Sequence, residues 1–319
     1  MGKTDKEEAP PGMRQTNACC APLESFQQQK LYSCTAVLTP CPLVLMFLFF
    51  GIVCVILGIV FLVSSIFVHE TEVYRYDNLC NLGSKCTFRF EIDQDLEEPV
   101  FLYYRIEGIY QNYRKYKDSR SNGQLAGTTD VNDYDELVGD CGAETSLDDE
   151  DSSSHVFLPC GKGALSNFND TFTITKDNGK YIKQSRADVA WPTDARLYKD
   201  PGKDTKGVRV VDSFENPNFE VWMRVAALPN FLKLYAVIEE DLPKGTYHME
   251  IHNRYPVHEF EGEKMFKLAT VTWIGGQKWF LGGFFVVIGI VMLISSCFVC
   301  LKANLWPRKV GNIAYLDWD

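Results

Sequence analysis

The sequence lacks the local motifs of the common enzyme classes. It contains no Gly-x-Ser-x-Gly nucleophile elbow and no His-Glu-x-x-His zinc-binding helix. Residues 201–207, PGKDTKG, have the composition of a phosphate-binding loop but not its Gly-x-x-x-x-Gly-Lys-Ser/Thr order, so we interpret them as a turn. We therefore expect no catalytic residue, no cofactor and no metal ion.

Two long stretches lack charge altogether. Residues 43–68 and residues 279–301 contain no Asp, Glu, Lys, Arg or His. As a helix, the first stretch would be about 39 Å long, which exceeds a hydrocarbon layer of about 30 Å. A core helix of a soluble protein is rarely this long. We expect both stretches to cross a membrane, and they offer no intramembrane ion or proton relay.

The two spans divide the chain into five parts. We expect an N-terminal tail at 1–42, a first transmembrane helix at 43–68, a large domain at 69–278, a second transmembrane helix at 279–301 and a C-terminal tail at 302–319. The large domain carries 25 Lys and Arg against 36 Asp and Glu, a net charge of −11. This acidity argues against a nucleic-acid partner.

The basic residues beside the second span do not decide which side of the membrane the domain occupies. Three lie on the domain side and three on the tail side: Lys264, Lys267 and Lys278 against Lys302, Arg308 and Lys309. The first 40 residues are polar, so no cleavable signal peptide is visible, and we expect the first span to act as the insertion signal.

Cysteines and one glycosylation sequon predict a luminal or extracellular domain with both tails in the cytosol. The domain contains Cys80, Cys86, Cys141 and Cys160, and the sequon begins at Asn169. Four cysteines allow three pairings. We choose 80 with 86 and 141 with 160, because neighbours in sequence meet at the smallest entropic cost.

Small residues recur every seven positions in both spans. Seven residues make two helical turns, so each span should present a narrow seam where another helix can approach closely. The alternative is that glycine is simply common in membrane helices. The predicted seams consist of Gly51, Gly58 and Ser65 in the first span and Gly282, Gly289 and Ser296 in the second.

Alternating and apolar runs predict a mainly antiparallel, β-rich α+β domain. We expect a short helix with an aromatic face at 110–120 and a mobile acidic loop at 140–155. One run, residues 248–252, places His248, Glu250 and His252 on one strand face, a set that zinc accepts and that a solvent-facing strand also produces. The predicted strands are residues 87–92, 100–106, 208–211, 219–226, 232–238, 247–251 and 265–272.

Six ordered motifs resemble the cell division control protein 50 family, also called ligand-effect modulator 3. The likeness extends over nearly all of the chain from residue 26. The motifs are YQNYRKYKDSR at 110–120, PCG at 159–161 with SNFNDT at 166–171, WP at 191–192, FEVWMRVAALP at 219–229 with KLY at 233–235, NRYPV at 253–257 with FEG at 260–262, and GG at 275–276 with FLG at 280–282.

The resemblance implies a non-catalytic subunit of type-IV P-type ATPases, the phospholipid flippases. It implies a glycoprotein that acts as a chaperone for folding and export from the endoplasmic reticulum, and that resides there, in Golgi or endosomal membranes and in the plasma membrane. We select Trp191, Trp222 and Arg224 as residues of interface or structural importance. A two-span ligand-gated channel subunit is the alternative, and a membrane-anchored luminal enzyme is a third.

Overall fold

The structure is a computed structural model that describes residues 39–127, 134–146, 156–202, 205 and 207–307. The chain divides into two compact units, Cys54–Val287 on one hand and Met1–Val53 with Ile288–Asp319 on the other. The first unit holds every strand of the described residues. The described part of the second consists of the N-terminal part of one long helix and the C-terminal part of another.

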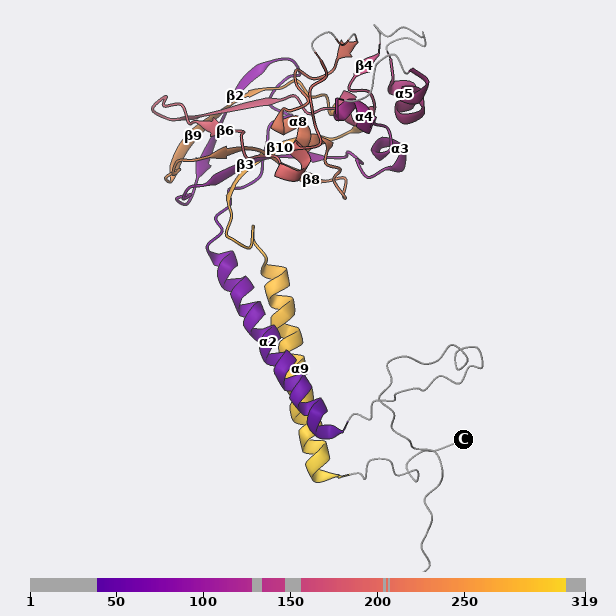
Figure 1. The fold of residues 1–319 in the computed structure, drawn as a ribbon. Coiled ribbons are helices and arrows are strands. Elements are labelled where there is room, and N and C mark those ends of the chain that lie inside the picture. The colour runs from indigo at the N-terminus through magenta and orange to yellow at the C-terminus, as the bar shows by residue number, and fades with distance from the viewer. Residues whose placement is uncertain (1–38, 128–133, 147–155, 203–204, 206, 308–319) are drawn as a thin grey trace, which may run out of the picture. The chain divides into compact units, whose positions relative to one another are not determined.

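The two long helices are α2, Pro40–Ile66, and α9, Trp279–Leu305. Figure 1 shows them as the indigo and yellow helices. Both are long and apolar enough to cross a membrane, and most of their large side chains are exposed in the isolated chain, as lipid-facing residues must be. The predicted fold class is confirmed: the chain is a two-span membrane protein with a large antiparallel β-rich domain.

The β-rich domain contains three sheets, and every ladder except one is antiparallel. Strand β3 lies at the centre of the largest sheet, with β10 and β8 on either side, and β9 lies between β2 and β5. The largest sheet has the order β1 (Tyr74–Arg75), β10 (Glu263–Thr270), β3 (Val100–Glu107), β8 (Phe231–Ile238), β6 (Gln184–Ser185). The second has the order β2 (Lys85–Ile92), β9 (Gly245–His252), β5 (Thr171–Lys176), and β4 (Phe157–Leu158) pairs in parallel with β7 (Val208–Arg209).

Short helices connect the strands. Several of them gather beside β4, near one end of the domain (Figure 1). They are α3 (Arg114–Lys117), α4 (Asn122–Leu125), α5 (Tyr134–Cys141), η1 (Gly142–Glu144), α6 (Lys162–Leu165), α7 (Pro192–Ala195), α8 (Pro217–Met223) and η2 (His258–Phe260).

Aromatic rings fill much of the core. The rings of Tyr104 and Phe168 stack with centroids 4.0 Å apart, and Phe172 meets the edges of Tyr76 and Tyr235. Aromatic pairs contribute about 0.5–1.5 kcal/mol each beyond the burial of their surface. The alternating burial along β3 points one of its faces into this core, as the sequence predicts.

The strand predicted at 219–226 is wrong, because residues 217–223 form α8. Asn216 caps this helix by accepting from the amide of Asn218, and Pro217 occupies its first turn. Phe219 and Trp222, three residues apart, then face the core together. The apolar run has helical spacing as well as alternation, and the cap and the proline favour the helix.

Three other predictions differ from the structure. Of the helix predicted at 110–120, only Arg114–Lys117 is helical, and Tyr110 and Tyr113 are exposed rather than packed on one face. The strand predicted at 208–211 is the two-residue β7. The acidic loop predicted at 140–155 begins within α5 and η1, and its residues 147–155 lie outside the described part of the chain.

Candidate functional site

Within Cys54–Val287, the small residues of the two spans lie in close contact. A methyl group added to Gly58 would lie 2.8 Å from the Val286 backbone nitrogen and 2.9 Å from the Gly282 carbonyl oxygen. The Ser65 hydroxyl accepts a hydrogen bond of 2.8 Å from the Lys278 amide, at the end of α2. Glycine at position 58 is therefore required by the proximity of the neighbouring backbone.

The other unit repeats this arrangement. An added methyl on Gly51 would lie 3.2 Å from the carbonyl oxygen of Gly289 and 3.0 Å from the Leu293 side chain. The Ser296 hydroxyl donates a hydrogen bond of 3.1 Å to the carbonyl of Val44. In each unit the predicted seam residues face the other helix.

Two disulfides close short loops in the β-rich domain. The structure joins Cys80 to Cys86 and Cys141 to Cys160, over sequence separations of 6 and 19. These are the pairs that the sequence analysis chooses. By the chain-entropy model the longer loop contributes about 3 kcal/mol and the shorter about 2 kcal/mol, largely by restricting the unfolded chain.

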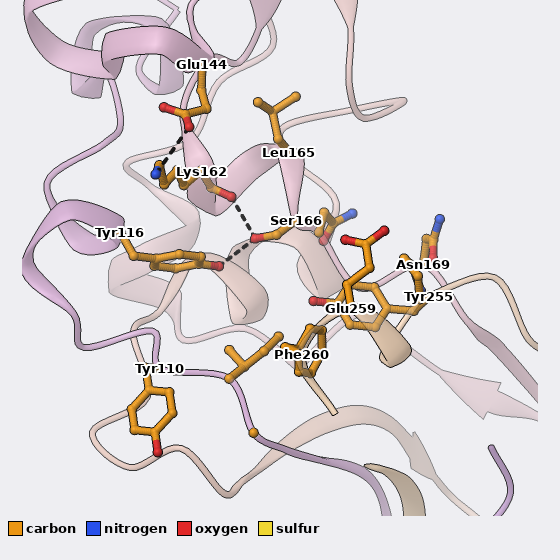
Figure 2. Close-up of a pocket in the computed structure, with 14 residues that line it drawn as sticks. Tyr110, Tyr116, Glu144, Lys162, Leu165, Ser166, Asn169, Tyr255, Glu259 and Phe260 are labelled. Carbon is orange, nitrogen blue, oxygen red and sulfur yellow. Dashed lines mark hydrogen bonds and ion pairs between the residues drawn. The ribbon is translucent and has the colours of Figure 1, made fainter. Parts of the chain in front are cut away.

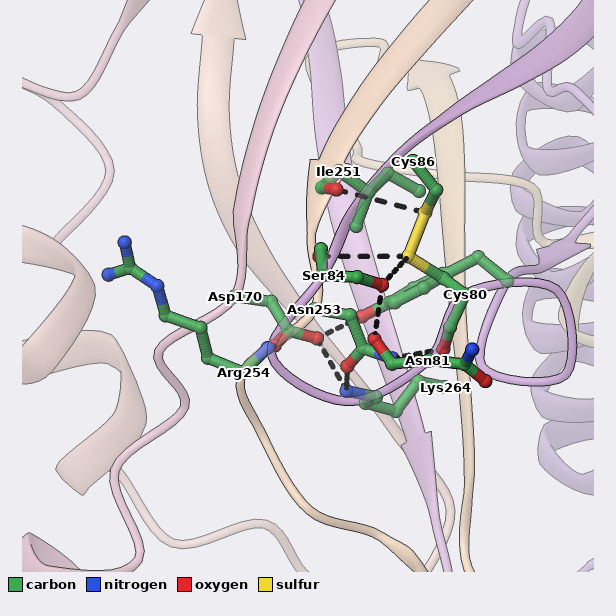
Figure 3. The surroundings of a disulfide bond; sticks show 10 residues. Cys80, Asn81, Ser84, Cys86, Asp170, Ile251, Asn253, Arg254 and Lys264 are labelled. Carbon is green, nitrogen blue, oxygen red and sulfur yellow. Dashed lines mark hydrogen bonds and ion pairs between the residues drawn. A yellow bond between two sulfur atoms is a disulfide. The ribbon is translucent and has the colours of Figure 1, made fainter.

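A buried ion pair lies beside the first disulfide (Figure 3). The Lys264 ammonium lies 2.7 Å from the Asp170 carboxylate, and the two side chains are 1% and 0% exposed. The other carboxylate oxygen accepts from the amides of Arg254 and Tyr255, both at 2.6 Å. Burial lowers the pKa of Lys264, and the charge of Asp170 opposes that shift. Asp170 thus ties β10 to the start of β5.

The remaining donors and acceptors of this cluster are also satisfied. The Tyr76 hydroxyl donates to Asp170 at 2.7 Å, and Lys264 donates to the Asn253 side chain and to the Tyr255 carbonyl. The Asn253 amide group donates to the Cys80 carbonyl at 2.6 Å, which joins the cluster to the disulfide. Such full pairing is what makes a buried charge tolerable.

Lys264 corrects one step of the sequence analysis. Counting Lys264 among the charges beside the second span is wrong, because it lies in the core of the domain. Lys267 and Lys278 remain on the domain side, and Lys267 pairs with Glu70. Without Lys264, two basic residues flank the second span on the domain side and three on the tail side, so the tail side has a small excess of positive charge.

Trp191 and Arg224 lie together on the surface of the domain. The Arg224 guanidinium lies 4.6 Å from the centre of the Trp191 ring and 3.5 Å from the Asp194 carboxylate. Trp191 is 63% exposed, and both residues line a cavity of about 400 Å³. Trp222 lies in the core instead, where its indole donates to the Gly163 carbonyl at 2.8 Å. Trp191 and Arg224 therefore suit a contact surface, and Trp222 suits a packing role.

Lys233 lines the same cavity and was missed by sequence reasoning. Its ammonium donates to the carbonyls of Trp222 and Arg224, at 2.6 Å and 2.8 Å, and is 4.8 Å from the centre of the Trp222 ring. Burial lowers the pKa of Lys233 to about 7. Two signals were available: its place in the KLY motif at 233–235 and its place inside the otherwise apolar strand Phe231–Ile238.

Asn169 lies on the rim of a cavity of about 550 Å³ (Figure 2). Its side chain is exposed, whereas its neighbours Phe168 and Asp170 are buried. The cavity wall carries the aromatic residues Tyr110, Tyr116, Tyr255 and Phe260 and the ion pair between Lys162 and Glu144.

Comparison with known proteins decides the family. The model described as the LEM3 (ligand-effect modulator 3) family / CDC50 family matches residues 69–309. The chain belongs to this family.

Curated members of the CDC50 family align with nearly the whole chain. ALA-interacting subunit 3 of Arabidopsis thaliana is 31% identical, over 92% of this chain and 89% of its own length. Cell cycle control protein 50A of Bos taurus is 32% identical, over 91% and 90%. The alignment with a solved structure from Sulfurospirillum deleyianum covers 65% of this chain and 98% of the other, with 11% sequence identity and a TM-score of 0.22.

Four of the six motifs of this CDC50-family chain meet in the fold. Cys160 and Gly161 open α6, whose Gly163 carbonyl holds the Trp222 indole. Gly161 has a φ of +100°, and an added methyl would lie 2.2 Å from the carbonyl oxygen of Ser119 in the first motif. Asp170 of the second motif binds the backbone of Arg254 and Tyr255 in the fifth. The first, second, fourth and fifth motifs therefore meet in one core.

The strand considered for zinc has other contacts. In β9, the His248 ring lies 3.2 Å from the Asp177 carboxylate, and Arg254 donates to His252 at 3.0 Å. Glu250 is exposed. No group of three or more His, Cys, Asp or Glu arranged to hold a metal ion occurs among the residues that the structure describes.

Proposed function

We propose that this chain is a non-catalytic subunit of a type-IV P-type ATPase that moves phospholipids across a membrane. The observation that carries the proposal is the family membership, supported by relatives that are named ALA-interacting subunits. The spans at 43–68 and 279–301 contain no charged residue that could form a path for an ion or a lipid headgroup, and Lys302 follows the second span in the last turn of α9. ATP hydrolysis and lipid transport would then belong to the partner.

We further infer the orientation of the subunit. The domain at 69–278 lies in the lumen or outside the cell, and the tails at 1–42 and 302–319 lie in the cytosol, so the spans at 43–68 and 279–301 cross in opposite directions. Two disulfides and a sequon suit the oxidising, glycosylating compartment. The complex would form in the endoplasmic reticulum and continue to Golgi, endosomal or plasma membranes.

The subunit would act as a scaffold and chaperone. The exposed Trp191 with Arg224 above its ring offers the kind of aromatic and arginine contact that dominates protein interfaces. The exposed faces of α2 and α9 can pack against a membrane helix of the ATPase. Covering the luminal loops of the pump would stabilise its folded form and permit export from the endoplasmic reticulum.

Co-purification tests this function. The chain, expressed in eukaryotic cells with an affinity tag, is extracted in mild detergent, and its partner is identified by mass spectrometry. We expect a one-to-one complex with a P-type ATPase, and loss of ATPase export from the endoplasmic reticulum when the subunit is absent. A homo-oligomer that conducts ions after reconstitution would contradict the proposal and support the channel alternative.

A pair of variants tests the contact surface. We expect Trp191→Ala to lower recovery of the ATPase about tenfold or more, as loss of an interface hot spot does. Leu197→Ala, which removes an equally exposed side chain from the same region, is the matched control. Equal recovery with both variants would remove Trp191 from the interface.

A further inference from the structure

The cavity beside Asn169 contains one buried polar atom without a partner among the described residues, and it has the glycosylation sequon on its rim. The Asn167 side-chain oxygen is buried in its wall with no hydrogen-bond partner among the described residues. Tyr255 is only 5% exposed and lines the same cavity, and its hydroxyl points into the cavity in Figure 2. Buried polar groups are normally paired, so the Asn167 oxygen points to a missing ligand.

Other wall residues are fixed in place. The Ser166 hydroxyl donates to the Lys162 carbonyl at 2.6 Å and accepts from the Tyr116 hydroxyl at 2.7 Å (Figure 2). Lys162 also pairs with Glu144 at 3.3 Å. Glu259, by contrast, is exposed and lies close enough to Tyr255 to raise the pKa of its hydroxyl further, beyond the effect of burial. The cavity thus combines aromatic faces with an unpaired amide oxygen and an exposed carboxylate.

This combination suits a sugar. Hydroxyl and acetamido groups of an N-acetylhexosamine can pair with amide, hydroxyl and carboxylate groups, and its less polar ring face packs on aromatic side chains. The volume of about 550 Å³ falls within the range of about 300–1,000 Å³ seen for small-molecule pockets.

The sequon at Asn169 indicates which sugar would occupy the cavity, because the first sugar of an N-linked glycan is N-acetylglucosamine. The Asn169 backbone is held on both sides, by the stacking of Phe168 on Tyr104 and by the four hydrogen bonds that Asp170 accepts. A glycan attached to Asn169 would therefore begin at a fixed point on the cavity rim, at a very high effective concentration. We propose that this cavity binds the first N-acetylglucosamine of the glycan on Asn169 and makes it part of the folded domain.

The inference rests on the luminal orientation given under the proposed function. Asn169 begins the only Asn-x-Ser/Thr sequon in the sequence, so the intact mass of the chain reports its occupancy directly. The full chain is made in cells that add only high-mannose glycans and is purified in detergent. A chain without a glycan would overturn both the orientation and the inference.

Enzymatic trimming tests the cavity itself. Endoglycosidase H leaves one N-acetylglucosamine on Asn169, and peptide-N-glycosidase F removes the whole glycan. We expect the single-sugar form and the untrimmed form to have the same melting temperature. This temperature should be about 2–4 °C higher than that of the sugar-free form and that of the Asn169→Gln variant. If the single-sugar form has the same melting temperature as the sugar-free forms, the cavity does not bind the sugar. The proposed function is unaffected by that result.

Two exposed tyrosines provide a matched pair of variants. Tyr110 lines the cavity and Tyr113 does not, and they are 64% and 61% exposed. We expect Tyr110→Ala to reduce the melting difference between single-sugar and sugar-free forms by half or more, and Tyr113→Ala to leave it unchanged. Equal effects of the two variants would overturn the role of the cavity, and ATPase co-purification would still report the proposed function separately.

Discussion

Asp170 shows how one residue can hold several segments. Replacing Asp170 with Asn keeps its size and the sequon but leaves the Lys264 ammonium without its counter-charge in the core. We expect a loss of about 3–5 kcal/mol in the free energy of unfolding, because an unpaired buried charge is far more costly than a lost surface contact. Thermal unfolding of the full chain in detergent measures the loss.

Two further variants separate charge from packing. Glu240→Gln breaks the exposed pair between Lys180 and Glu240 and should change stability by about 1 kcal/mol or less. Adding Lys264→Met to Asp170→Asn removes the unpaired charge and should restore part of the loss. A double variant less stable than the single one would contradict this explanation.

The buried Lys233 should make the stability of the folded protein depend on pH. Its pKa of about 7 in the folded protein lies below its ordinary value of 10.5, so between these values the unfolded chain binds the additional proton. The contribution of Lys233 to stability therefore rises with pH from about 7 upward, by at most about 1.4 kcal/mol per pH unit. We expect the melting temperature of the wild type to rise relative to that of Lys233→Met between pH 7 and pH 9. Parallel pH curves for the two proteins would refute the shift.

At the scale of elements, the close packing of the two long helices can be tested by replacing single glycines with alanine. Gly58→Ala would place a methyl group 2.6 Å from the Val286 side chain, and the resulting overlap should lower stability by about 1–3 kcal/mol. Gly283→Ala meets nothing within 4 Å, so it should be neutral or stabilise the helix by up to about 1 kcal/mol. Melting temperatures in detergent compare the two variants, and equal losses would exclude close packing at Gly58.

The elements also mark the limit of sequence reasoning. The spans and most long strands were predictable because lipid and a half-buried sheet each impose a simple pattern. The run at 219–226 satisfied two periodicities, and only its capping Asn216 and Pro217 favoured α8. The partners of Lys233 and Lys264 come from other segments, so local sequence could not reveal either buried cation. The cavity beside Asn169 likewise depends on tertiary contacts.

At the scale of the whole molecule, the number of crossings determines where each part works. Two spans return the chain to its starting side, which is the cytosol in the proposed orientation, so tags on both termini should be digested by protease added to sealed microsomes, while the β-rich domain stays intact. The protease should digest the β-rich domain, with its two disulfides and compact core, only after detergent opens the vesicles. Immunoblots for each tag and for the domain read the outcome. If one tag is protected, the termini lie on opposite sides, and either the β-rich domain or one tail faces the wrong compartment for the proposed complex.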